Sequence, residues 1–156
     1  MTQIEITADW EYIADRVMGG VSAGQMTQEM VQGRMATRLC GDVSLENNGG
    51  FVQIASDLPD IDASGWDGIM LDLCGNGESY DIRLRTDQLT RPWQSFRADF
   101  TARPDWQSLT FPFADFTPQK HDIPFDPAAL RRVGILAIGR AFVADVAVAG
   151  LRLYRD

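Results

Sequence analysis

The sequence predicts an all-β fold, an antiparallel jelly-roll β-sandwich with at most short helical turns, formed as one domain by residues 1–156. Three observations predict it. Apolar and polar residues alternate with a period of two in about eight short segments. Turns rich in glycine, asparagine, aspartate and proline separate these segments, and no stretch keeps a helical period. Without helices to cover parallel strands, the sheets must be mostly antiparallel, and a sandwich buries such strands around one core.

The alternation is clear in residues 68–74, where Ile69, Leu71 and Leu73 share one face while Asp72 faces away. Residues 34–40 are a weaker candidate. One helical turn is expected at residues 126–132, because Asp126 can cap it and Pro127 suits the first helical position. In chain order, we expect strands at residues 34–40, 51–56, 68–74, 80–86, 94–101, 106–113, 133–138 and 146–154.

The charge balance excludes two classes of partner. The chain has 22 acidic and 14 basic side chains, a formal net charge of −8. Nucleic acids and anionic lipids both attract clusters of basic side chains, so we expect neither as a partner. The apolar runs are far shorter than the roughly 20 residues of a membrane span, and the N-terminus lacks a basic, apolar leader. We therefore expect no direct membrane insertion and a cytoplasmic location.

The residue types needed for catalysis and metal binding are scarce. The single histidine, His121, lies in a polar segment, and we expect it to be a solvated loop residue without a catalytic triad. Cys40 and Cys74 are far apart in sequence, inside predicted strands, which is typical of small buried side chains. The acidic segment 57–67 is either a calcium loop or a solvated acidic loop, and its spacing misses the EF-hand signature. We expect no cofactor, no metal and no enzyme activity.

Two glycine-containing segments are the most specific feature of the sequence. They read DRVMGGVS at residues 15–22 and ENNGGF at residues 46–51. The pairs Gly19-Gly20 and Gly49-Gly50 supply turn conformations cheaply and let another backbone pack closely, so both pairs are predicted to be structural turns.

Together these segments resemble the complex I intermediate-associated protein 30 family. The resemblance implies a galactose-binding-like β-sandwich. Mitochondrial members of that family are chaperones that hold membrane-arm intermediates of respiratory complex I, whereas this chain is similar to compact, single-domain bacterial members. The implied partners are complex I subunits or assembly intermediates. Further matching positions are Trp10, Leu45, residues 66–68, 75–77, Tyr80, residues 106–107, residues 111–113, Phe116 and Gly139.

The two segments form the first candidate site if they meet in space. Their polar side chains then either hydrogen-bond a partner or hydrogen-bond one another, and the second alternative would make the motif a network that fixes the fold. The candidate binding residues here are Asp15, Arg16, Met18, Glu46, Asn47 and Asn48.

The second candidate site is formed by Arg91, Trp93 and Gln94, between two predicted strands. Trp93 is either a stacking platform for a sugar or partner protein, or a side chain packed on the edge of the sandwich. The leading hypothesis is a non-catalytic protein-binding module that assists assembly or stability of a respiratory complex. The alternative is a module that binds carbohydrate or another small ligand.

Overall fold

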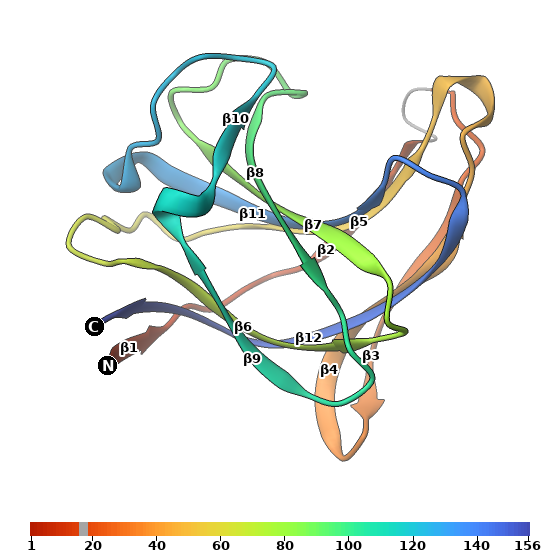
Figure 1. Cartoon of the computed structure of the whole chain (residues 1–156), viewed down its shortest axis with the longest axis horizontal. Helices are drawn as coiled ribbons and strands as arrows, with labels where there is room; N and C mark the ends of the chain where they lie inside the picture. Colours follow the sequence, from red (N-terminus) through yellow and green to blue (C-terminus); the bar gives the residue numbers. More distant parts are fainter. Residues whose placement is uncertain (16–18) are drawn as a thin grey trace.

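The computed structural model describes residues 1–15 and 19–156 and places them in two facing antiparallel sheets (Figure 1). This confirms the predicted all-β sandwich. The first sheet has the order β3 (Ala23–Val31), β4 (Arg34–Val43), β12 (Phe142–Arg155), β6 (Gly68–Gly75), β9 (Gln107–Pro112), and β1 (Thr2–Glu5) also pairs with β12. The second sheet has the order β10 (Thr117–Gln119), β8 (Ser95–Thr101), β7 (Ser79–Thr86), β11 (Leu130–Ile138), β5 (Phe51–Asp57), β2 (Glu11–Ala14).

All eight predicted segments are strands in the structure, although several begin or end at other residues, and the predicted helical turn is shorter. The segment predicted as 106–113 stops at Pro112, because Phe113 begins a short 3₁₀ turn, η3 (Phe113–Asp115). The predicted helical turn at 126–132 shrinks to η4 (Pro127–Ala129), which Asp126 caps by accepting a hydrogen bond from the amide of Ala128. From Leu130 onward the chain pairs with β7 and β5 as β11, so strand pairing replaces the helix there.

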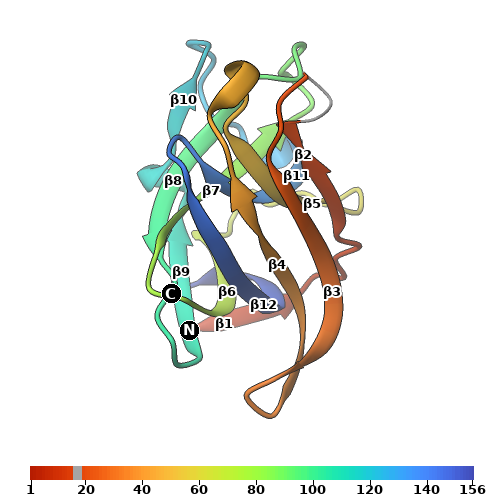
Figure 2. The same cartoon turned by 90° about the vertical axis from the view of Figure 1, so that its right-hand side faces the viewer.

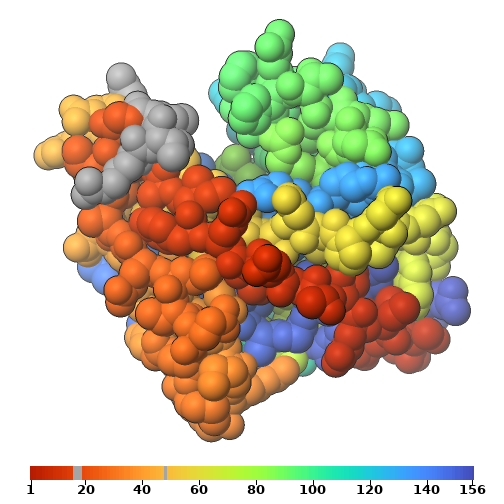
Figure 3. Space-filling view, turned by 180° about the vertical axis from the view of Figure 1, so that it is seen from behind, coloured from red at the N-terminus to blue at the C-terminus, as the bar shows by residue number. Residues whose placement is uncertain are grey.

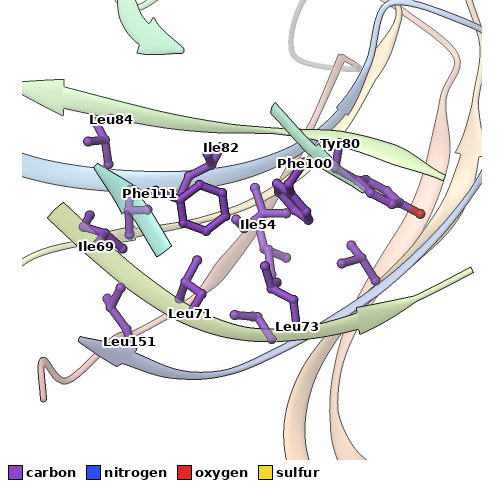
Figure 4. Close-up of a cluster of buried hydrophobic side chains, with 14 of the residues drawn as sticks. Ile54, Ile69, Leu71, Leu73, Tyr80, Ile82, Leu84, Phe100, Phe111 and Leu151 are labelled. Carbon is purple, nitrogen blue, oxygen red and sulfur yellow. The ribbon is translucent and has the colours of Figure 1, made fainter. Parts of the chain in front are cut away.

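The core lies between the two sheets and follows the predicted alternation. Figure 4 shows Ile69, Leu71 and Leu73 of β6 directed toward Ile82 and Leu84 of β7 across the space between the sheets. Burying each such side chain contributes about 1.5–3 kcal/mol to the free energy of unfolding. Because the inner face is apolar, function has to lie on the outer faces, edges and loops.

Asp72 lies on the outer face of the first sheet, as predicted, but it is buried rather than solvated. Its carboxylate accepts hydrogen bonds from Arg34 (2.6 Å), Arg152 (2.5 Å) and Ser108 (2.5 Å). Burial alone would raise the pKa of Asp72, but the hydrogen bonds from Ser108 and Arg34 hold it below the ordinary value.

The β3–β4 hairpin extends beyond the sandwich, as Figure 2 shows, and its end is tied back to the first sheet. The indole nitrogen of Trp106 donates to the carbonyl of Val31 (3.0 Å), and the Arg34 guanidinium lies 5.3 Å from the Trp106 ring.

Cys74 packs into a small apolar cluster on the outer face of the first sheet, and both cysteines are free thiols. Burial raises the pKa of the Cys40 thiol to about 11, so it stays protonated at neutral pH.

Candidate functional site

The outer face of the second sheet is hollowed, and both predicted site regions lie beside this hollow. Figure 3 shows a depression beside the β7–β8 loop, residues 87–94, which is drawn in green. The turn that carries the 3₁₀ segment η2 (Glu46–Asn48) rises at the opposite end of the same sheet (Figure 1), and we call this turn the first wall and the β7–β8 loop the second wall. The outer faces of β11 and β5 form its floor. We call this depression the hollow.

Asp15 holds the first wall together. Its carboxylate is fully buried and accepts four hydrogen bonds, from the amide (3.1 Å) and hydroxyl (2.5 Å) of Ser22 and from the amides of Gly50 (2.6 Å) and Phe51 (3.2 Å). Burial alone would raise the pKa of Asp15, but these hydrogen bonds outweigh it and hold the pKa below its ordinary value. The structure therefore joins the two glycine segments through one buried carboxylate.

The glycines of the motif make room for that carboxylate. A Cβ atom on Gly20 would lie 2.5 Å from Cγ of Asp15, and one on Gly49 would lie 2.5 Å from its Oδ2. Ser22 extends the network, because its hydroxyl accepts from the amide of Ser44 at 2.8 Å. Asp15, Gly20 and Gly49 consequently position the turn, and Asp15 and Gly20 are buried, so they have no surface through which to contact a partner.

The crest of the first wall carries the solvent-facing residues of the motif. Glu46 and Asn47 are exposed, and Asn47 adopts a left-handed conformation (φ 55°) that asparagine tolerates well. Leu45, which is not among the predicted binding residues, is also half exposed. The backbone of Asn48 belongs to the same turn, whereas Arg16 and Met18 lie outside the described residues.

The second wall presents Trp93 to solvent. Its side chain is 62% exposed, so it does not pack on the sandwich edge, and the Arg91 guanidinium lies 6.0 Å from its ring. Gln94 has a different role, because its side-chain oxygen accepts from the amides of Thr90 (3.2 Å) and Arg91 (3.1 Å) and so shapes the loop.

Arg85 anchors this loop and was not selected from the sequence. Its Nη1 donates to the carbonyls of Arg91 (2.9 Å), Pro92 (2.7 Å) and Gln94 (3.2 Å). The alternation of β7 placed Arg85 on the polar face, but only the structure shows which carbonyls lie over it.

Charged side chains that pair with one another cover the part of this sheet next to the second wall. Arg97 makes two hydrogen bonds to the buried carboxylate of Asp81 (2.7 and 3.0 Å), and Arg83 donates to the same carboxylate at 2.8 Å. Arg83 of β7 pairs with Arg97 of β8 on one side and with Gly134 of β11 on the other. The charged side chains of β7 and β8 therefore have no side chain beside them at this position of β11. The pairing neutralises most of the charge locally and leaves a rigid polar surface.

His121 is a correction to the sequence analysis, because it is half-buried rather than a solvated loop residue. Its Nδ1 accepts from the amide of Ile123 (3.1 Å), so Nε2 carries the proton and donates to the carbonyl of Ser95 (2.8 Å). The ring also packs edge to face on Phe96, with centroids 4.8 Å apart. His121 thus fixes the start of β8.

The acidic segment 57–67 makes local contacts instead of converging on one point. Asp57 pairs with Arg132 (2.6 Å), and Asp62 accepts from the amide of Ser64 (2.9 Å). In residues 1–15 and 19–156, no group of three His, Cys, Asp or Glu side chains is arranged to hold a metal ion. No helix in that part of the chain is long and apolar enough to span a membrane.

Comparison with known proteins identifies a family and a fold. The family model described as complex I intermediate-associated protein 30 (CIA30) matches residues 1–145. A search of curated proteins finds no match.

Solved structures with a similar fold include carbohydrate-binding modules. A family 11 module from Clostridium thermocellum, solved with a β-1,3-1,4-mixed-linked tetrasaccharide, superimposes with a TM-score of 0.75 at 14% identity, covering 97% of this chain and 95% of that one. The family 30 module of the cellulosomal cellulase Cel9D-Cel44B from the same organism gives 0.62 at 17% identity, covering 100% and 99%. At such identities the similarity shows the jelly-roll fold alone.

Proposed function

This chain belongs to the complex I intermediate-associated protein 30 family, and from that premise we propose that it is a non-catalytic protein-binding module. Its role is to assist assembly or stability of a respiratory multisubunit complex, with complex I subunits or assembly intermediates as its partners. The hollow is the proposed contact surface. The observation that carries this proposal is a hollow between two walls that are each fixed from within, one by Asp15 and the other by Arg85.

The exposed groups on the walls suit a protein partner. Trp93 and Arg91 belong to the residue types enriched at interface centres, and Glu46 and Asn47 offer polar contacts at the opposite wall. The paired charges of Asp81 and Arg97 give the surface a fixed pattern of charge, which favours specificity and register over raw affinity.

Carbohydrate binding is the second candidate, and one observation favours it. Trp93 exposes an aromatic ring beside Arg91 on the wall of the hollow, and such rings stack on sugars. Asp81, Arg83 and Arg97 favour a protein instead, because they present paired charges rather than further aromatic faces.

Affinity capture under gentle conditions distinguishes the two candidates. The tagged chain should recover complex I subunits from native lysate, and Trp93→Ala should reduce that recovery at least fivefold. Met30→Ala is the matched control, because Met30 is similarly exposed but lies on the β3–β4 hairpin away from the hollow. Failure to recover any complex I subunit, with normal complex I in a deletion strain, would contradict the proposal. Binding to a glycan array that Trp93→Ala abolishes would favour the carbohydrate candidate.

A further inference from the structure

A second concave surface lies at the edge of the sandwich. A groove of about 660 Å³ runs between β8 of the second sheet and β9 of the first, and we call it the edge groove. Phe100 and Phe111 lie along it, one from each sheet, with ring centroids 5.7 Å apart in an edge-to-face contact. Ala98 and Leu109 are half-buried along its walls and join the two phenylalanines in one apolar strip, while polar and charged side chains form the rest of the lining.

Both sheets leave a strand edge unpaired at this groove. Among the described residues, β9 pairs only with β6, and β10 covers β8 only at Ser95–Arg97. The carbonyls of Ser95 and Arg97 point toward β10 and the segment after it, where they accept from His121 and from the Thr117 hydroxyl. Because strand geometry alternates, the backbone N–H and C=O of Asp99 point to the same edge, beyond the end of β10.

We propose that the edge groove binds one extended segment of a partner polypeptide. The segment pairs with β8 over residues 98–101, in line with β10, and places alternate apolar side chains against Phe100, Phe111 and Leu109. This mode of recognition takes its affinity from main-chain hydrogen bonds and its specificity from alternate side chains. The inference deepens the proposed function, because it rests on the partner being a protein.

The geometry selects this occupant over two others. Phe100 and Phe111 are only 8% and 5% exposed, so they offer edges for packing but no open ring face on which a sugar stacks. If a second copy of this chain paired its own β8 edge here, the β9 strand that flanks that edge would come along, so two folded copies obstruct each other in this symmetric arrangement. Arg103 and Asp115 lie exposed in the lining and form no ion pair within the described residues, so a segment without net charge fits best.

The test uses synthetic peptides as probes. An eight-residue fluorescein-labelled peptide that alternates valine and threonine is compared with one of the same composition in which four valines precede four threonines. Fluorescence anisotropy should show at least tenfold tighter binding of the alternating peptide. N-methylation of alternate amides should abolish binding in one register and leave it in the other, because a strand that pairs along one edge uses only every second N–H.

Measurements on the protein locate the site. Hydrogen exchange at the Asp99 amide should slow when the alternating peptide binds, and Ala98→Phe, which fills the groove, should weaken binding at least tenfold. Gln25→Phe is the control, because Gln25 is exposed on β3 outside the groove. The exchange measurement uses the wild-type protein, so it tests whether the peptide binds at the edge groove even if Ala98→Phe does not fold.

Equal binding of both peptides, binding of neither, or unchanged exchange at Asp99 would overturn the edge-groove proposal. Failure of the edge-groove proposal can be distinguished from failure of the proposed function. If wild type and folded Ala98→Phe capture complex I subunits equally, the module binds its partner elsewhere and only the groove inference fails. If the peptide binds as expected but no complex I subunit is ever captured, the groove stands and the proposed function fails.

Discussion

Asp15 shows how one buried residue links two distant stretches of sequence. A carboxylate without solvent is costly unless hydrogen bonds surround it, and here Ser22, Gly50 and Phe51 supply them. Each glycine pair therefore contributes to the surroundings of this one carboxylate, the first through Gly20 and the second through Gly49 and Gly50. The motif fixes the wall of the hollow, and contact with a partner falls to its exposed crest, Glu46 and Asn47.

Replacing Asp15 with asparagine tests this role through pH. Hydrogen bonds hold the pKa of Asp15 below its ordinary value of 3.8, so the unfolded chain binds more protons than the folded chain between the two values. The stabilisation from Asp15 is complete above about pH 4 and is lost as pH falls through the folded pKa. Asp15→Asn should lower the free energy of unfolding at pH 7 by about 2 kcal/mol and should flatten its decline below pH 4.

Urea unfolding from pH 7 to pH 2 measures both effects. Asp42→Asn is the control, because Asp42 is exposed on β4, and it should leave the curve unchanged. An Asp15→Asn curve that parallels wild type over the whole range would show that the carboxylate charge does not stabilise the turn.

At the scale of single residues, the sequence indicated part of the site and missed part. The joint occurrence of the two glycine segments led to the expectation that they meet, and Asp15 joins them. The roles of Arg85 and Asp81 were not predicted, because alternation places a side chain on a face but says nothing of its partners. Those depend on strand register and on loop conformation, which bring Arg97 and the carbonyl of Pro92 within reach.

The η2 turn depends on the absence of a side chain at Gly49. Gly49→Ala should lower the free energy of unfolding by about 2 kcal/mol, because the new methyl would overlap the Asp15 carboxylate. Gly134→Ala is the matched control, since its Cβ would approach only the ends of Gln53 and Leu136 at 3.3 Å, and these can shift. Thermal unfolding measures both changes.

A double-mutant cycle sharpens this prediction. Asp15→Ala removes the group that Gly49→Ala would strike, so the double variant should be more stable than the sum of the single effects by about 1 kcal/mol or more. Strict additivity would show that Gly49 and Asp15 do not compete for space.

The β7–β8 loop depends on Arg85 in the same way. Arg85→Ala removes three hydrogen bonds to carbonyls of the loop, so backbone amides of residues 87–94 should exchange with solvent about tenfold faster, while those of the core strands should not change. Hydrogen exchange followed by mass spectrometry measures this, with Arg103→Ala as the exposed control. Unchanged exchange in the loop would mean that other contacts hold Trp93 in place.

At the scale of elements, the strands that build the core were predictable and four others were not. β6 alternates large apolar residues and is buried along nearly its whole length. β3 lacks a run of large apolar residues and is mostly exposed, and it exists because all of its residues pair with β4. β1, β2 and β10 are only three or four residues long and depend equally on a neighbouring strand. Pairing of this kind leaves little trace in the sequence of the paired strand.

At the scale of the whole molecule, the two proposed contact surfaces meet at β8. Arg97 and Asp99 project from the outer face of the second sheet and also line the edge groove. A partner that covers the hollow is therefore able to continue over the edge of the sheet with an extended segment. The hollow and the edge groove can therefore contact the same partner.

Site-specific photo-cross-linking tests the central claim, that the hollow is where the partner binds. A photoreactive residue is placed at position 93 on one wall, at position 46 on the other, and at position 30 on the β3–β4 hairpin as the control, since Trp93, Glu46 and Met30 are all exposed. In cells that assemble complex I, positions 93 and 46 should cross-link to the same complex I subunit or assembly intermediate, and position 30 should give at least fivefold less. Equal cross-linking from position 30, or no cross-link from either wall while complex I assembles, would contradict the account.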